Sequence, residues 1–123
     1  MVVNWVMREL PTGITAISFT GRLVLGNRLG DAEHEIRERI RQGSRKLLFD
    51  FSGLEYIDSA GIGTLAVCFG HMEREGGKVA VAGASGQVKK SMELTHLDRV
   101  AGMYPDVPSA QSALAEFTLG TPA

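Results

Sequence analysis

The sequence predicts a single α/β domain in which a mixed, mostly parallel sheet with an N-terminal antiparallel hairpin packs against about four helices. Three observations predict it. Apolar positions alternate near the N-terminus, short apolar runs then alternate with segments of helical periodicity, and the chain has 123 residues. This length suits one hydrophobic core and is short for two. We expect one domain over residues 1–118 and a flexible C-terminal tail over 119–123.

The first 21 residues have the pattern of a β-hairpin. Residues 2–7 are apolar except for Asn4 and include three valines, and residues 14–19 place two alternating sets of side chains on opposite faces. Between these runs, Pro11–Gly13 has the composition of a turn. We therefore expect two antiparallel strands joined by a tight turn.

The period changes after Gly21 to that of an amphipathic helix ending at Gly43. The outer positions are densely charged, which is typical of a solvated helix face with ion pairs such as Glu35 with Arg39. Apolar side chains recur every three or four residues at Leu25, Leu29, Ala32, Ile36 and Ile40.

A buried strand and a second helix follow. The run 46–51 is short, apolar and bounded by polar residues, as in a strand covered on both faces. The segment after Asp58 then has helical periodicity and closes at Gly76 and Gly77. Its expected buried stripe consists of Ile62, Leu65, Ala66, Phe69 and Met72.

The C-terminal third repeats this alternation. We expect a strand over 78–83, a helix over 85–94 with Ser85 as its cap, a short apolar strand around 100–104, and a last helix capped by Ser109. Strands that alternate with helices pair in parallel through right-handed crossovers. The buried stripe expected for the last helix is Ala110, Ala113, Leu114 and Phe117.

Composition excludes several classes of function. Thirteen basic and fourteen acidic residues are spread along the chain, so we expect no direct nucleic-acid partner. No stretch approaches the length of a membrane span, and we expect no membrane insertion. The single cysteine, Cys68, indicates a small core residue and a reducing, cytoplasmic setting. The three histidines lie in separate segments, so neither a metal nor another cofactor is expected.

The stretch "EYIDSAGIGT", residues 55–64, is the candidate site. A serine at a strand-to-helix turn resembles the nucleophile of a hydrolase, but that motif needs a glycine where Ile57 stands. It also needs a histidine base, and His71 lies about three helical turns away from Ser59. The corner "GASG", residues 83–86, lacks the lysine of a phosphate loop. The residues therefore predict no enzyme.

Asp58 and Ser59 precede the second helix, and either could be its N-cap. Capping does not explain the glycine pair Gly61 and Gly63, each of which costs a helix about 1 kcal/mol relative to alanine. This cost suggests that something comes close to the first turn. An exposed serine there would be accessible to a kinase, and a phosphate would place roughly two negative charges beside Asp58.

At these residues the chain resembles a STAS domain of the anti-sigma factor antagonist family. The resemblance runs over "TGRLVLGN", "KLLFDFSGLEYIDSAGIGTL", "EREGGKVAVAGASGQVKKSMELTHLDRV" and "VPSAQSALAEF". Its most specific part is the Asp-Ser-x-Gly-Ile-Gly core that follows an apolar strand.

The resemblance implies a small switch protein that regulates transcription by partner switching. The unphosphorylated domain would bind an anti-sigma factor that is also a serine protein kinase and so free a sigma factor. The kinase would then phosphorylate Ser59, and a serine phosphatase would reset the cycle. The implied partner-binding residues are Asp58, Ser59, Ala60, Gly61 and Ile62.

Two departures from the family pattern bear on this function. Many antagonists have Gly-Glu-Leu-Asp after the second strand, whereas this chain has Arg22 and Val24 at the acidic positions. Ala60 also stands where serine is frequent, which leaves Ser59 as the one hydroxyl of the turn. The alternative is a STAS domain that does not switch and serves as a scaffold or regulatory subunit of a stress-sensing or transport complex.

Overall fold

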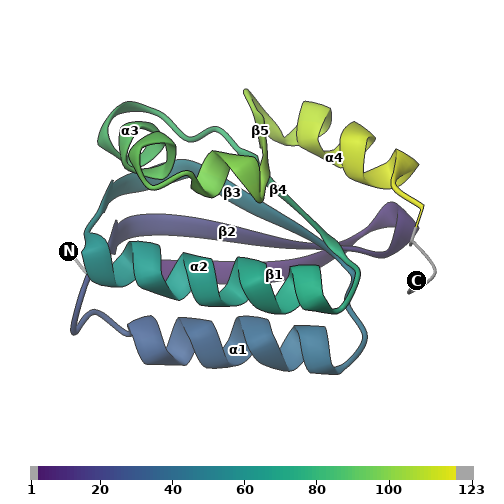
Figure 1. Cartoon of the computed structure of the whole chain (residues 1–123), viewed down its shortest axis with the longest axis horizontal. Helices are drawn as coiled ribbons and strands as arrows, with labels where there is room; N and C mark the ends of the chain where they lie inside the picture. The colour runs from purple at the N-terminus through teal and green to yellow at the C-terminus, as the bar shows by residue number, and fades with distance from the viewer. Residues whose placement is uncertain (1–2, 119–123) are drawn as a thin grey trace.

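The computed structural model describes residues 3–118, which form a mixed sheet of five strands in the order β1-β2-β3-β4-β5 (Figure 1). β1 is antiparallel to β2, and the pairs β2–β3, β3–β4 and β4–β5 are parallel. This arrangement confirms the predicted hairpin and parallel sheet. The strands are β1 (Asn4–Leu10), β2 (Ile14–Leu23), β3 (Lys46–Ile57), β4 (Lys78–Ala82) and β5 (Gly102–Tyr104).

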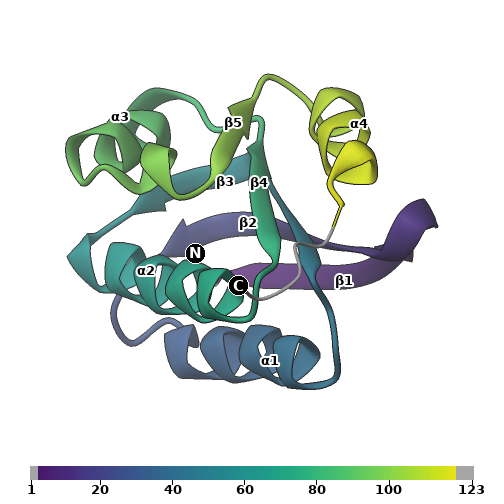
Figure 2. The ribbon, with the colours of Figure 1, turned by 45° about the vertical axis from the view of Figure 1, so that its right-hand side comes forward.

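Within residues 3–118, four α-helices cover the two faces of this sheet unequally. α1 and α2 pack side by side on one face, and α4 lies across the other (Figures 1 and 2). The buried side chains of α3 join the same core cluster as those of α1 and α2. The helices are α1 (Leu29–Arg41), α2 (Ser59–Arg74), α3 (Gly86–Leu94) and α4 (Val107–Glu116), with short 3-10 turns η1 (Pro11–Gly13) and η2 (Leu97–Arg99).

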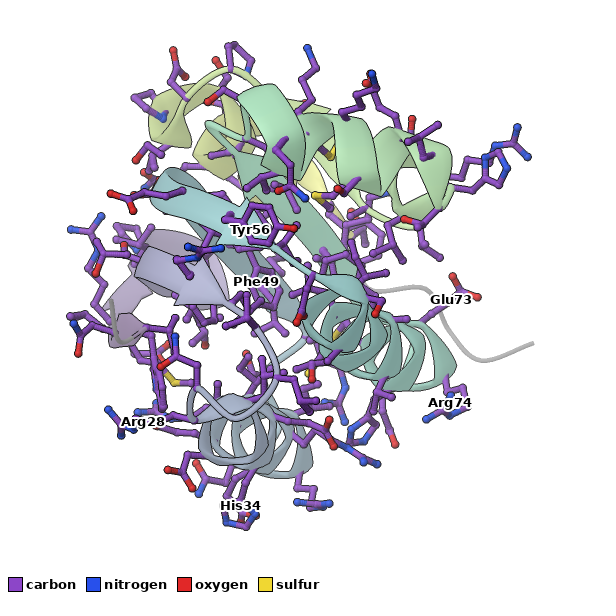
Figure 3. The ribbon with its side chains drawn as sticks, turned by 90° about the vertical axis from the view of Figure 1, so that its left-hand side faces the viewer. Arg28, His34, Phe49, Tyr56, Glu73 and Arg74 are labelled. Carbon is purple, nitrogen blue, oxygen red and sulfur yellow. The ribbon has the colours of Figure 1, made fainter. Side chains whose placement is uncertain are left out.

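An aromatic cluster fixes α2 on the sheet. Phe49 is fully buried, stacks on Phe19 at 6.2 Å between ring centroids, and meets Phe69 of α2 edge-on at 5.3 Å. Figure 3 shows Phe49 in the interior of the molecule. Pairs of this kind contribute about 1 kcal/mol each beyond their buried area. The C-terminal half of α2, which contains Phe69, is therefore held against β2 and β3.

The expected helix from residue 25 was wrong at its start. Leu25 precedes α1 and is 79% exposed, because the chain passes through left-handed conformations at Gly26 (φ 77°) and Arg28 (φ 64°). α1 therefore begins at Leu29. In α2, Ala66 is exposed instead of buried, and Cys68 takes the core position. Burial raises the pKa of the Cys68 thiol to about 12, which makes it an unreactive core residue.

Two further local expectations were wrong. The cap of α4 is Asp106, whose carboxylate accepts a hydrogen bond of 2.8 Å from the N–H of Ser109, so Ser109 lies inside the helix. A carboxylate three residues before a free N–H outcompetes the later hydroxyl for this position. Glu35 does not pair with Arg39. It accepts a hydrogen bond of 2.7 Å from the indole of Trp5, and Arg39 contacts Glu9 at 3.2 Å.

The length of β3 positions the functional end of the sheet. We expected a strand over 46–51, but β3 continues to Ile57 because β2 stays paired with it along this extension. β4 pairs only with residues 46–50 of β3. The last residues of β3 therefore extend beyond β4 and carry the chain into α2 at an exposed end of the sheet. The tail predicted over 119–123 lies outside the described residues.

Candidate functional site

The carboxylate of Asp58 joins three segments at the N-terminus of α2. One oxygen, Oδ1, accepts a hydrogen bond of 2.9 Å from the N–H of Gly61, and Oδ2 accepts one of 3.0 Å from the N–H of Leu25. The N–H of Asp58 donates to the carbonyl of Leu23 at 3.3 Å. Asp58 is therefore the N-cap, Ser59 is the first helical residue, and the loop after β2 is held against α2.

Hydrogen bonds also determine the charge state of Asp58. Burial raises the pKa of this carboxyl, but the backbone N–H groups of Leu25 and Gly61 outweigh burial and hold the pKa below its ordinary value of 3.8. Asp58 is therefore ionised at neutral pH and presents a fixed negative charge next to Ser59.

This lowered pKa predicts an acid-sensitive contribution to stability. A carboxyl with a depressed folded pKa stabilises the native state above its unfolded pKa and loses that contribution as the pH falls through the folded pKa. We expect the difference in free energy of unfolding between the wild type and Asp58→Asn to narrow as the pH is lowered below about 4. Urea denaturation across a pH series measures this, with Asp98→Asn as the control for net charge. A difference that stays constant down to pH 2 would contradict it.

The two glycines of the first turn of α2 have different surroundings. A Cβ on Gly61 would lie 2.2 Å from the carbonyl oxygen of Leu23 and 2.7 Å from a side-chain carbon of Ile57. The close approach that the sequence suggested at Gly61 is therefore made by the end of β2. A Cβ on Gly63 would meet nothing within 4 Å, so this position opens onto solvent.

Ser59 is exposed at the start of α2 and lines a groove between α2 and α3. Its neighbours on the predicted site differ in burial. Ala60 and Ile62 are partly buried against the core, and Gly61 is buried. Of the predicted site residues, Ser59 therefore offers the most accessible reactive group.

Exposed apolar side chains surround this end of the molecule. Leu25, in the loop held by Asp58, is 79% exposed, and Leu94, at the end of α3, is 70% exposed. Tyr56, at the end of β3 (Figure 3), is 36% exposed. It lines the groove together with Ser59 and Leu94. Sequence reasoning placed Leu25 in a helix and singled out neither of the others. Large exposed apolar side chains gathered around one polar group are typical of a protein contact site.

Gln87 is a second residue that sequence reasoning missed. Its amide oxygen accepts a hydrogen bond of 3.0 Å from the N–H of Ile57, and its amide nitrogen donates to the carbonyl of Ile57 at 2.7 Å. The side chain thus takes the place of a neighbouring strand beyond the end of β4. It fixes α3 beside the last residue of β3 and so forms one wall of the groove.

Removing this pairing should lower stability measurably. Gln87→Ala leaves the buried N–H and C=O of Ile57 without their partners, and we expect a loss of about 2 kcal/mol in the free energy of unfolding. Lys90→Ala, an exposed change on the same helix, is the matched control and should change stability by less than about 0.5 kcal/mol. Equal effects of the two variants in chemical denaturation would show that the pairing does not stabilise the fold.

Other candidate sites carry less chemistry. No three histidine, cysteine or acidic side chains within residues 3–118 are grouped to hold a metal ion. In that same range, no helix is both long and apolar enough to cross a membrane.

His34 points away from α1 into solvent (Figure 3), and His71 accepts a hydrogen bond from Arg37 at 3.3 Å, far along α2 from Ser59. At the corner 83–86, Gly83 has φ 74° and packs against Ser52, as expected for a tight turn.

Comparison with known proteins assigns this architecture. The family model of the STAS domain matches residues 6–110. A protein of Thermotoga maritima aligns with a TM-score of 0.83 and 18% identity, covering 89% of this chain and 93% of its own. An anti-sigma factor antagonist from Mycobacterium paratuberculosis aligns with a TM-score of 0.81 and 23% identity, covering 93% of this chain and 95% of its own. The phosphorylated form of the Bacillus cell fate determinant SpoIIAA aligns with a TM-score of 0.74 and 18% identity, covering 89% of this chain and 98% of its own. At these identities the structural likeness establishes the fold.

Proposed function

The chain belongs to the STAS domain family, and from this premise we propose that it is an anti-sigma factor antagonist switched by phosphorylation of Ser59. In its unphosphorylated form it binds an anti-sigma factor that is also a serine protein kinase, and this binding releases a sigma factor in the cytoplasm. The kinase then transfers a phosphate to Ser59, and a serine phosphatase removes it. The chain itself is a substrate and not an enzyme.

The observation that carries this proposal is the placement of the Ser59 hydroxyl. It is exposed on the first residue of α2, while Asp58 fixes the backbone around it through its hydrogen bonds to Leu25 and Gly61. A rigid, accessible hydroxyl with small neighbours suits a kinase, which must align its acceptor with the γ-phosphate. The exposed side chains of Leu25 and Leu94 supply apolar contact area around it.

The same geometry explains how a phosphate would end the contact. The N–H groups of the first turn and the helix dipole tolerate an anion at Ser59, so the fold survives the modification. A bound partner would meet a new dianion beside the ionised Asp58 in a desolvated interface. An unpaired charge buried in an interface is strongly unfavourable, so the partner is released.

Displacement of the sigma factor tests this function. The purified protein is added to a complex of the source organism's anti-sigma factor and sigma factor, and free sigma factor is quantified by gel filtration. We expect release of the sigma factor by the unmodified protein and none after stoichiometric phosphorylation of Ser59. Release that is equal before and after phosphorylation would refute the switch.

The alternative is a STAS scaffold or regulatory subunit of a stress-sensing or transport complex. Arg22 favours it, because many antagonists carry an acidic residue at this position and this side chain is exposed at the end of β2 beside the site. In a scaffold, Ser59 would be only the first residue of a capped helix. A partner complex that forms equally well with wild-type protein and with Ser59→Asp would favour this second function.

A further inference from the structure

The groove between α2 and α3 indicates which chemical groups the proposed partner presents to this surface. Resting on the proposed function, we propose that this groove is part of the kinase interface and receives an apolar side chain of the kinase, next to a kinase carboxylate that pairs with Arg22. Its lining includes Tyr56, Ser59, Ile62, Gln87, Ser91 and Leu94.

The groove favours an apolar occupant because its polar wall is already satisfied. The amide of Gln87 is bonded to both backbone groups of Ile57 and donates to the hydroxyl of Ser91 at 3.0 Å. The one charged lining residue, Asp58, directs its carboxylate to the N–H groups of Leu25 and Gly61. The surface left for a ligand is therefore mainly the side chains of Tyr56, Ile62 and Leu94, which suit an aliphatic or aromatic group.

The rim of the groove supplies a positive charge. The guanidinium carbon of Arg22 lies 4.6 Å from the centroid of the Tyr56 ring, and the two residues are register partners on β2 and β3. A cation held over an aromatic face keeps its position at little entropic cost. Because Arg22 remains exposed, it is available to a carboxylate of the partner, and like charges at this point would be repelled.

The position of the groove beside Ser59 points to the kinase as its occupant. A stable complex buries about 800 Å² on each partner, which one turn of a helix cannot supply. The groove adds contact area that reaches from Ser59 on α2 to Leu94 on α3. A segment seated there would lie against the Ser59 hydroxyl, so a phosphate on Ser59 would expel the occupant of the groove as well.

Photo-crosslinking in the source cell separates this inference from the proposed function. A p-benzoylphenylalanine is introduced at Leu94 in the groove, at Leu25 beside the site, or at Val6, an exposed apolar control on β1. We expect Leu94 and Leu25, but not Val6, to capture the same serine kinase, and the peptide captured by Leu94 to contain an aspartate or glutamate. Capture from Leu25 alone would refute the assignment of the groove to the kinase interface and would leave the proposed function standing. Capture from neither position would overturn both.

Charge reversal then tests the assigned carboxylate. Arg22→Glu should weaken binding of the captured kinase by about tenfold or more, and lysine in place of the kinase carboxylate should restore it. Arg8→Glu, at an exposed arginine on β1, is the matched control and should leave affinity within about twofold. Unchanged affinity of Arg22→Glu, or a groove crosslink to a second copy of this chain, would contradict the inference.

Discussion

Ser59→Asp is expected to weaken binding of the anti-sigma kinase by about 100-fold, which corresponds to about 3 kcal/mol. The new carboxylate would lie next to the ionised Asp58, at the centre of a surface formed by exposed apolar side chains such as Leu25. Burying this charge without a partner costs more than the lost contacts alone. Isothermal titration of the kinase with wild type and variant measures the difference.

Two control variants keep this result specific. Ser59→Ala removes the phosphate acceptor without adding charge, and it should bind the kinase as tightly as the wild type. Ser85→Asp places the same charge at another exposed serine, the N-cap of α3, and should leave affinity within about twofold. Since helices accept acidic residues near their N-termini, neither aspartate should reduce thermal stability. Equal weakening by Ser59→Asp and Ser85→Asp would show that the effect is not local to the site.

Gly61→Ala is expected to lower the free energy of unfolding by about 3 kcal/mol, while Gly63→Ala raises it by up to about 1 kcal/mol. The Cβ added at Gly61 overlaps the carbonyl oxygen of Leu23, which is backbone and cannot rotate away. The same atom added at Gly63 meets open solvent and gains the helix propensity of alanine. Urea denaturation of this pair isolates the contact with β2. A similar change in both variants would contradict the assigned packing.

The elements that periodicity determines could be predicted from the sequence, and those determined by long-range contacts could not. The stripe that buries Leu29, Ala32, Ile36 and Ile40 is local information and was confirmed. The break before Leu29 depends on left-handed residues that no apolar pattern reveals. The site divides in the same way.

The Asp58 and Ser59 turn was visible in the sequence, because a polar pair before a helix is a local signal. The reason why position 61 must be glycine was not visible in the sequence, because the carbonyl of Leu23 lies against Gly61 only after β2 and β3 pair. The groove between α2 and α3 could not be predicted from the sequence either. Gln87 and Ile57 are 30 residues apart in the chain, and their pairing depends on the crossover that brings α3 back to the end of β3.

Native mass spectrometry of the complex with its kinase during incubation with ATP tests the phosphorylation switch itself. It follows phosphate transfer and complex dissociation in one sample, and fragmentation of the released chain locates the phosphate. We expect a single phosphate on Ser59, and we expect phosphorylated chains to be free of the kinase. A phosphate on another residue, or a complex that stays intact with phosphorylated Ser59, would contradict this switch.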